Sequence, residues 1–131
     1  MTEVRQIVRI ISSDIPGEKP ISMALISIPG VGHSFSTALC NSLQLDRRRK
    51  VGTLSNEEVK TIEEAIKDPL KYKIPSFLLN RKKDPETGED MHLNTSGLRL
   101  TQEFDIKKFK KIKSYKGIRH ALGLPVRGQR T

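Results

Sequence analysis

The chain has 131 residues, of which 30% are charged and 35% hydrophobic, and its formal net charge is +9. This length fits one domain with a modest core and argues against a multidomain enzyme. A single cysteine excludes an internal disulfide framework and favours a reducing, cytoplasmic location. Charged residues interrupt the apolar start, which excludes a signal peptide, and no stretch approaches the roughly 18 apolar residues that a membrane span needs.

The first part of the chain predicts a strand followed by a helical hairpin. Residues 4–11 are rich in Val and Ile and predict a short strand, and residues 14–17 (DIPG) predict a turn after it. A helix is predicted over residues 20–27, because apolar residues recur there at spacings of four and three. Pro29 and the glycine after it end this helix, and a second helix begins near His33.

The middle of the chain predicts a third helix and a loop. Ser55 followed three residues later by Glu58 forms a capping box, which predicts the start of a helix that Pro69 stops. Residues 74–79 are apolar and are expected to pack on the helices. Residues 84–88 (DPETG) predict a tight reversal that could join two brief strands.

The last third of the chain predicts a long basic helix and a tail. Phe104 and Ile112 lie eight residues apart, with lysines at most of the positions around them. The segment that follows, SYKGIRHALGLPVRGQRT, is interrupted by three glycines and a proline, so at most one or two turns of helix are expected. Such a segment cannot form its own core, and we expect an anionic partner to order it.

Positive charge is concentrated in this last third. Residues 101–131 contain nine basic residues and two acidic ones, and no carboxylate side chain follows Asp105. A solvated face would explain a short run of lysines, but an ordinary surface mixes both signs of charge. The pattern therefore favours a surface that faces nucleic acid. Its basic residues are Lys107, Lys108, Lys110, Lys111, Lys113, Lys116, Arg119, Arg127 and Arg130.

The sequence IPGVG at residues 28–32 joins the first two predicted helices. Gly30 can take a positive φ to end the first helix, and Gly32 lies where unpaired N–H groups of the second helix favour an anion. The pattern is similar to the helix-hairpin-helix motif, which grips nucleic-acid backbones without reading bases. The alternative interpretation of the two glycines is purely structural, a C-cap glycine followed by a glycine that allows close packing. The basic tail elsewhere in the chain favours the phosphate-binding interpretation. His33 and Ser34 belong to this predicted interface.

No motif proposes a reaction. The three histidines and Cys40 lack the spacing of metal ligands, and the chain has neither a Gly-x-Ser-x-Gly elbow nor a Gly-x-x-x-x-Gly-Lys loop. We therefore predict no catalytic residue, no metal and no cofactor. Only six aromatic residues occur, and the phenylalanines fall on apolar stripes, so contact with backbone and shape is expected rather than base stacking.

Three segments carry a resemblance to a known family. SYKGIRHALGLPVRGQRT strongly resembles the signature of the universal small-subunit ribosomal protein thirteen family. DIPGEKPISMALISIPGVGHSFSTALC is similar to the family's Asp-Ile-Pro segment and its Gly-x-Gly helix hairpin. IPSFLLNRKKDPETGED looks like the longer archaeal and eukaryotic branch, which inserts a small hairpin before the long helix. The resemblance covers nearly the whole chain.

The resemblance implies a mainly α fold, with a helix-two-turn-helix core over residues 1–80. Residues 81–131 would form a small β-hairpin, a long basic helix and an extended RNA-binding tail. On this chain the resemblance places the RNA-facing glycines of the hairpin at 30 and 32. In the tail, the residues that the resemblance assigns to the RNA-facing signature are Tyr115, Lys116, Gly117, Arg119, His120, Arg127, Gly128, Gln129 and Arg130.

For function, the resemblance implies a structural, non-enzymatic component of the head of the small ribosomal subunit. The implied partners are small-subunit rRNA, small-subunit ribosomal protein nineteen and, through bridges from the head, the large subunit. Relatives usually continue with further Lys and Arg residues after the signature. Contact with the peptidyl-site tRNA therefore stays open for this chain.

Two other functions remain as alternatives. A DNA-binding or DNA-repair accessory domain would use the same hairpin, but no catalytic Asp, Lys or N-terminal proline can be placed here. A protein-interaction helix bundle with an incidental basic tail is the weaker alternative.

Overall fold

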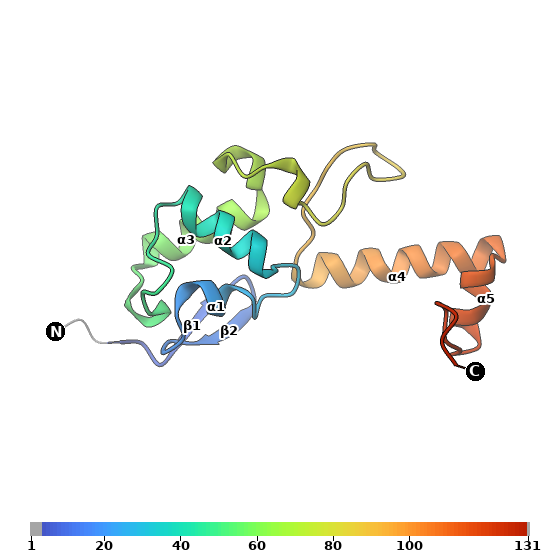
Figure 1. Ribbon diagram of the computed structural model, residues 1–131, viewed down its shortest axis with the longest axis horizontal. Coiled ribbons are helices and arrows are strands. Elements are labelled where there is room, and N and C mark those ends of the chain that lie inside the picture. Colours follow the sequence, from blue (N-terminus) through green and yellow to red (C-terminus); the bar gives the residue numbers. More distant parts are fainter. Residues whose placement is uncertain (1–3, 131) are drawn as a thin grey trace. The chain divides into compact units, whose positions relative to one another are not determined.

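The computed structural model describes residues 4–130, which form two compact units divided after Thr95 (Figure 1). The first unit contains the strands β1 (Ile7–Ile10) and β2 (Ser13–Pro16) and the helices α1 (Ile21–Leu25), α2 (His33–Ser42) and α3 (Asn56–Lys67). It also contains the 3-10 turns η1 (Val51–Thr53), η2 (Pro69–Tyr72) and η3 (Ser76–Leu78). Helix α4 (Thr95–Ile112) starts at the boundary, and α5 (Tyr115–Ala121) follows it.

Strands β1 and β2 pair antiparallel as a tight hairpin, with Ile7 opposite Pro16 and Ile10 opposite Ser13. The two-residue turn holds Ile11 and Ser12 at φ of 41° and 60°, the geometry of a hairpin turn that normally selects Asn or Gly. The turn predicted at residues 14–17 is thus wrong, because most of that stretch is strand β2. No favourable turn residue marks the true reversal.

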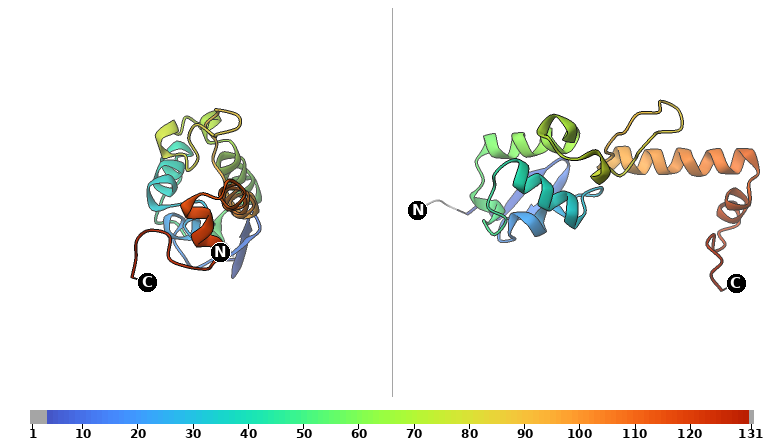
Figure 2. Two further views of the ribbon diagram at one scale, coloured as in Figure 1. Left: turned by 90° about the vertical axis from the view of Figure 1, so that its right-hand side faces the viewer. Right: turned by 45° about the horizontal axis from the view of Figure 1, so that its top comes forward.

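One hydrophobic core lies in the first unit, and both the hairpin and the helices α1 to α3 contribute to it (Figure 2). The helices were predicted at nearly these positions, and the apolar stripes of α2 and α3 are buried as expected. Fully or almost fully buried core residues include Ile10, Ile15, Leu25, Ile28, Phe35, Leu39, Val51, Ile62, Ile66 and Ile74.

Helix α3 begins as predicted. The Ser55 Oγ accepts a hydrogen bond from the Glu58 N–H at 3.1 Å, and the Glu58 carboxylate accepts one from the Ser55 N–H at 2.7 Å. Both halves of the capping box are therefore present. The helix ends at Lys67, two residues before Pro69 opens the turn η2.

Residues 80–93 form the predicted reversal without the two predicted strands. A single antiparallel bridge joins Arg81 to Met91, and the Asn80 side chain bonds the Leu93 backbone at both its N–H and its C=O. The stretch is too charged to offer a strand an apolar face. The mainly α fold with a small β-hairpin is confirmed, but the hairpin lies at the N-terminal end of the chain.

The second unit has no core of its own. Within residues 96–130, Gly117 is the one residue classed as buried. The long helix is confirmed, and the tail keeps only α5, which matches the expected one or two turns. Among the helices of residues 4–130, none has an apolar stretch of the length that a membrane crossing requires.

Candidate nucleic-acid interface

The two glycines of the IPGVG turn have different surroundings. Gly30 lies at φ +100°, and a Cβ on it would sit 2.4 Å from the Leu93 carbonyl oxygen and 3.0 Å from Asn94 Cα. The neighbouring Pro29 carbonyl accepts a hydrogen bond from the Thr95 N–H at 2.9 Å. Gly30 therefore has a structural reason to be glycine, because the backbone of residues 93–94 packs directly on it.

Gly32 faces open space instead. It is the N-cap of α2, with an extended φ of −99°, and apart from its two chain neighbours no described residue has an atom within 4 Å of a Cβ placed on it. No side chain caps this helix, and Gly32, His33 and Ser34 are all exposed. The first N–H groups of α2 and the positive end of its dipole are therefore accessible to an anion.

A buried histidine lies behind this turn. The ring of His92 stacks on Phe35 of α2, with centroids 4.0 Å apart and planes inclined by 2°. Both of its ring nitrogens lack a hydrogen-bond partner in residues 4–130. Burial lowers the pKa of His92, and the Gly30 backbone opposes this in part. The sequence predicted a surface or hydrogen-bonding histidine here, and the charged stretch at residues 81–90 gave no sign of a core position.

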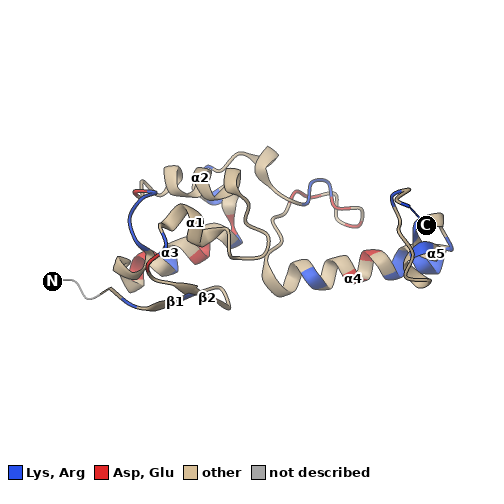
Figure 3. Cartoon of the chain, turned by 60° about the horizontal axis from the view of Figure 1, so that its bottom comes forward, with Lys and Arg blue, Asp and Glu red and all other residues tan. Residues whose placement is uncertain are grey.

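The lysines predicted to face RNA are exposed, and they cover the end of α4 and the start of α5 (Figure 3). Two of them lie over aromatic faces, Lys107 at 5.7 Å from the Phe104 ring and Lys116 at 5.9 Å from the Phe109 ring. Such contacts hold the ammonium groups near the helix without removing their charge. The exposed residues of the predicted interface in this unit are Lys107, Lys108, Lys110, Lys111, Lys113, Tyr115, Lys116, His120, Arg127, Gly128, Gln129 and Arg130.

Gly117 is the predicted interface residue that the structure buries. A Cβ on it would lie 2.2 Å from the Phe109 carbonyl oxygen and 2.6 Å from the Lys110 nitrogen, so α5 approaches the end of α4 at backbone contact. Ser114, which sequence reasoning did not single out, caps α5 by accepting from the Gly117 N–H at 3.2 Å and donates to the Phe109 carbonyl at 3.1 Å. The glycine therefore sets the angle between two helices.

Arg119 organises the tail. Its Nε donates to the Pro125 carbonyl at 3.0 Å, its own carbonyl accepts from the Leu124 N–H at 2.9 Å, and its guanidinium lies over the Tyr115 ring. Gly123 turns the chain at φ +67° between these contacts. Among the described residues, no hydrogen bond involves the two Nη groups of Arg119, so both can donate to a phosphate.

The site offers cations and backbone N–H groups and little else. Within residues 4–130, no group of three His, Cys, Asp or Glu side chains could hold a metal ion. After Asp105 no carboxylate side chain offsets the positive charge. Such a surface can neutralise phosphates through charge-assisted hydrogen bonds.

Comparison with known proteins identifies the family. Residues 9–131 match the family described as Ribosomal protein S13/S18. The chain belongs to this family. A protein of Nanoarchaeum equitans named small ribosomal subunit protein uS13 is 49% identical over 97% of this chain and 83% of its own length. Proteins of the same name from Methanothermobacter thermautotrophicus and Methanopyrus kandleri are 50% and 51% identical over 98% of this chain and 87% of their own lengths.

These relatives confirm the predicted family, and their archaeal type lies within the archaeal and eukaryotic branch that the sequence predicted. Membership of a structural ribosomal protein family also supports the prediction that the chain is not an enzyme.

Proposed function

We propose that this member of the ribosomal protein S13/S18 family is a structural component of the small ribosomal subunit in the cytoplasm. It binds small-subunit rRNA through the open N-terminus of α2 and through the exposed cations of α4, α5 and the tail. The observation that carries the proposal is the set of exposed cations after Asp105, in a family whose similar relatives bear the name of a small-subunit protein.

The binding mode follows from the side chains that are present. Lysine, arginine and backbone N–H groups contact phosphate oxygens, which fix position and do not read sequence. In α5 the exposed ring of Tyr115 has the Arg119 guanidinium over one face. The protein therefore recognises the backbone and shape of rRNA.

The finer parts of the proposal concern the place in the subunit. We place the protein in the head, beside small-subunit ribosomal protein nineteen. It contacts the large subunit through bridges from the head, and its basic C-terminal tail contacts the peptidyl-site tRNA if the tail extends that far. Exposed apolar side chains on α4, at Leu100, Phe104 and Ile112, support a protein contact in addition to RNA.

Salt dependence of RNA binding tests the proposal. If about six cations neutralise phosphates, log K for a small-subunit rRNA fragment should fall against log salt with a slope near about −4. Changing four lysines to Gln at 107, 108, 110 and 111 should make that slope shallower by about 3. A matched variant with Gln for Lys60, Lys67, Lys71 and Lys82 removes the same charge from exposed positions of the first unit and should bind almost normally.

Three results would contradict the proposal. A slope near zero for the unmodified chain would exclude phosphate neutralisation. Tighter binding to a DNA duplex than to the rRNA fragment would favour the DNA-binding alternative. Loss of the protein from ribosomes in a mild salt wash would favour the protein-interaction alternative.

A further inference from the structure

A second group of cations lies in the first unit, outside the predicted interface. The segment Asp46-Arg47-Arg48-Arg49-Lys50 joins α2 to the turn η1, and all five of its residues are charged. In Figure 3 most of this loop is blue. Neither the hairpin nor the tail includes it, so the proposed rRNA contacts do not account for it.

The backbone of this loop is fixed by the segment that enters α1. The Ile21 N–H donates to the Arg49 carbonyl at 2.9 Å, and the Val51 N–H donates to the Lys19 carbonyl at 3.0 Å. Pro20 and Lys50 form an isolated antiparallel bridge between these bonds. The loop is therefore held as a strand-like partner of residues 19–21.

Backbone contacts among Arg5, Gly17 and Gly52 also support this loop. The Arg5 N–H donates to the Gly52 carbonyl at 3.2 Å, and the Gly52 N–H donates to the Gly17 carbonyl at 2.9 Å. A Cβ on either glycine would collide with the Arg5 carbonyl oxygen, at 1.8 Å from Gly17 and 2.6 Å from Gly52. These contacts bring Arg5 and residues 17–19 beside the loop.

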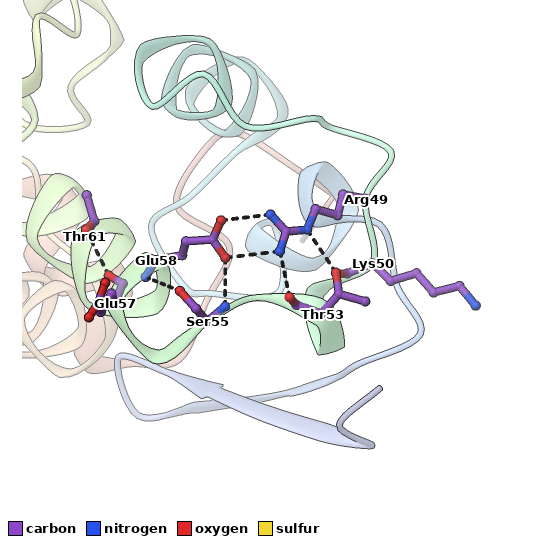
Figure 4. A network of polar contacts seen from close by, with 7 residues as sticks. All are labelled: Arg49, Lys50, Thr53, Ser55, Glu57, Glu58 and Thr61. Atoms are coloured by element: carbon purple, nitrogen blue, oxygen red, sulfur yellow. Dashed lines mark hydrogen bonds and ion pairs between the residues drawn. The ribbon is translucent and has the colours of Figure 1, made fainter. Parts of the chain in front are cut away.

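Arg49 turns inward and anchors the loop to α3 (Figure 4). Its two Nη groups donate to the Glu58 carboxylate at 2.8 and 3.2 Å, and one of them also donates to the Thr53 carbonyl at 2.7 Å. The Lys50 side chain extends away from this network in the same view. The Arg49 side chain thus stabilises the fold, whereas the side chains of Arg47, Arg48 and Lys50 take no part in this network.

The remaining cations are exposed and lack carboxylate partners. Within residues 4–130, Arg47, Arg48, Lys50 and Lys19 make no ion pair, and the Arg5 guanidinium bonds only the neutral side chain of Asn56. Among the described residues of the same segments, the exposed acids are Glu18 and Asp46, and Asp46 accepts the Arg48 N–H at 3.0 Å. Five cations against two carboxylates leave a clear positive excess on a rigid support.

We propose that this surface, consisting of Arg5, Lys19, Arg47, Arg48 and Lys50 and here named the loop patch, is a second rRNA contact that grips the phosphate backbone of double-helical RNA. This inference rests on the proposed function and adds a site to it. Arginine matches two phosphate oxygens with its planar fork, and a preformed support lowers the ordering cost of binding.

The composition of the patch favours duplex RNA over other anionic partners. Residues 46–50 contain no aromatic ring on which an unpaired base could stack. They also contain no apolar anchor of the kind that protein interfaces bury or that an interfacial membrane contact inserts. The remaining class of partner is an RNA duplex, whose regularly spaced phosphates a rigid row of cations can bind.

The first test removes charge from the loop in the full chain. The variant Arg47→Gln, Arg48→Gln, Lys50→Gln is compared with the matched variant Lys60→Gln, Lys67→Gln, Lys71→Gln, which has the same net charge. The loop variant should bind small-subunit rRNA at least about tenfold more weakly at 0.1 M salt, with a shallower slope of log K against log salt. The matched variant should stay within about twofold of the unmodified chain, since its lysines lie outside the patch. Circular dichroism checks that both variants fold.

The second test locates RNA directly. Cys40 is the one cysteine of the chain; it is buried, and burial raises the pKa of its thiol, so it should resist labelling. A hydroxyl-radical-generating iron chelate is attached to Arg48→Cys, to His120→Cys or to Lys60→Cys. Cleavage of duplex segments of small-subunit rRNA from position 48, but not from position 60, supports the loop patch.

The outcomes separate the inference from the proposed function. Cleavage from position 120 without cleavage from position 48, together with normal binding by the loop variant, overturns the loop patch and leaves the proposed function intact. Absence of cleavage from both positions overturns both. If the loop variant binds rRNA normally but loses affinity for anionic lipid vesicles or for an acidic protein, the patch exists but its partner is not RNA, and the inference is overturned.

Discussion

The two glycines of the IPGVG turn should respond oppositely to the same substitution. Gly30→Ala places a methyl group 2.4 Å from the Leu93 carbonyl oxygen at φ +100°, whereas Gly32→Ala places one in open space at φ −99°. The first change should damage the fold and leave the binding surface of folded molecules unaltered. The second should leave the fold almost intact and obstruct a phosphate at the start of α2.

The magnitude for Gly30→Ala has two parts. A side chain at positive φ costs about 1–2 kcal/mol. Relieving the collision requires residues 93–94 to move, which disturbs the Asn80–Leu93 hydrogen bonds of 2.6 and 2.8 Å and the stack of His92 on Phe35. Each lost hydrogen bond costs about 1 kcal/mol, so the total is about 2–4 kcal/mol. For a unit of this size the melting temperature should fall by about 10–20 °C.

For Gly32→Ala the fold loses little. Alanine is a poorer N-cap than glycine, so about 0.5–1 kcal/mol of stability should be lost. The added methyl group stands where a phosphate would approach the first N–H groups of α2, and the affinity for the rRNA fragment should fall several-fold.

Thermal unfolding followed by circular dichroism, combined with rRNA binding measured well below each melting temperature, distinguishes the two effects. The full chain is used for both variants. Equal loss of stability in the two variants would refute the packing role of Gly30. Normal RNA affinity in Gly32→Ala would remove the hairpin from the interface and leave the contact to the cations.

Three further changes test single contacts. Burial lowers the pKa of His92, so the free energy of unfolding should decrease as the pH falls through the ordinary histidine range. His92→Phe keeps a ring stacked on Phe35 and should remove this decrease. Urea unfolding between about pH 7.5 and about pH 5 measures it. Hydrogen bonds from the Ser55 N–H and then from Arg49 lower the pKa of Glu58, so its carboxylate stabilises the fold above the ordinary carboxyl pKa and this stabilisation is lost on acidification. Glu58→Gln should be less stable at neutral pH, and its stability should change less with pH in the acidic range. Gly117→Ala should displace α5 and weaken rRNA binding without changing the unfolding of the first unit, whereas Gly97→Ala, at an open helical position of α4, should bind normally.

Local signals in the sequence were sufficient for most of the helices. The capping box at Ser55 and Glu58 placed the start of α3, and apolar spacing placed α2. Glycine and proline spacing limited the helix in the tail to a short one. These features depend on residues within a few positions of one another, so a single sequence is enough to find them.

Other features depended on contacts between distant segments. The β1–β2 hairpin turns at Ile11 and Ser12, where no local residue favours positive φ, so its pairing is stabilised by burial of Val8, Ile10 and Ile15 in the core. Likewise, nothing near position 92 in the sequence indicates that His92 stacks on Phe35, 57 positions earlier.

The sequence by itself determined the family, through the resemblance of three segments. It also determined the helical elements and the net positive charge, since these follow from short-range spacing and from composition. Only the tertiary structure decided what each glycine and each cation does. Gly30 and Gly117 are covered by backbone while Gly32 is open, and Arg49 is bound to Glu58 while Arg47, Arg48 and Lys50 are exposed. The reason is that a side chain's role depends on what the folded chain brings against it, and identical residues one position apart can face opposite surroundings.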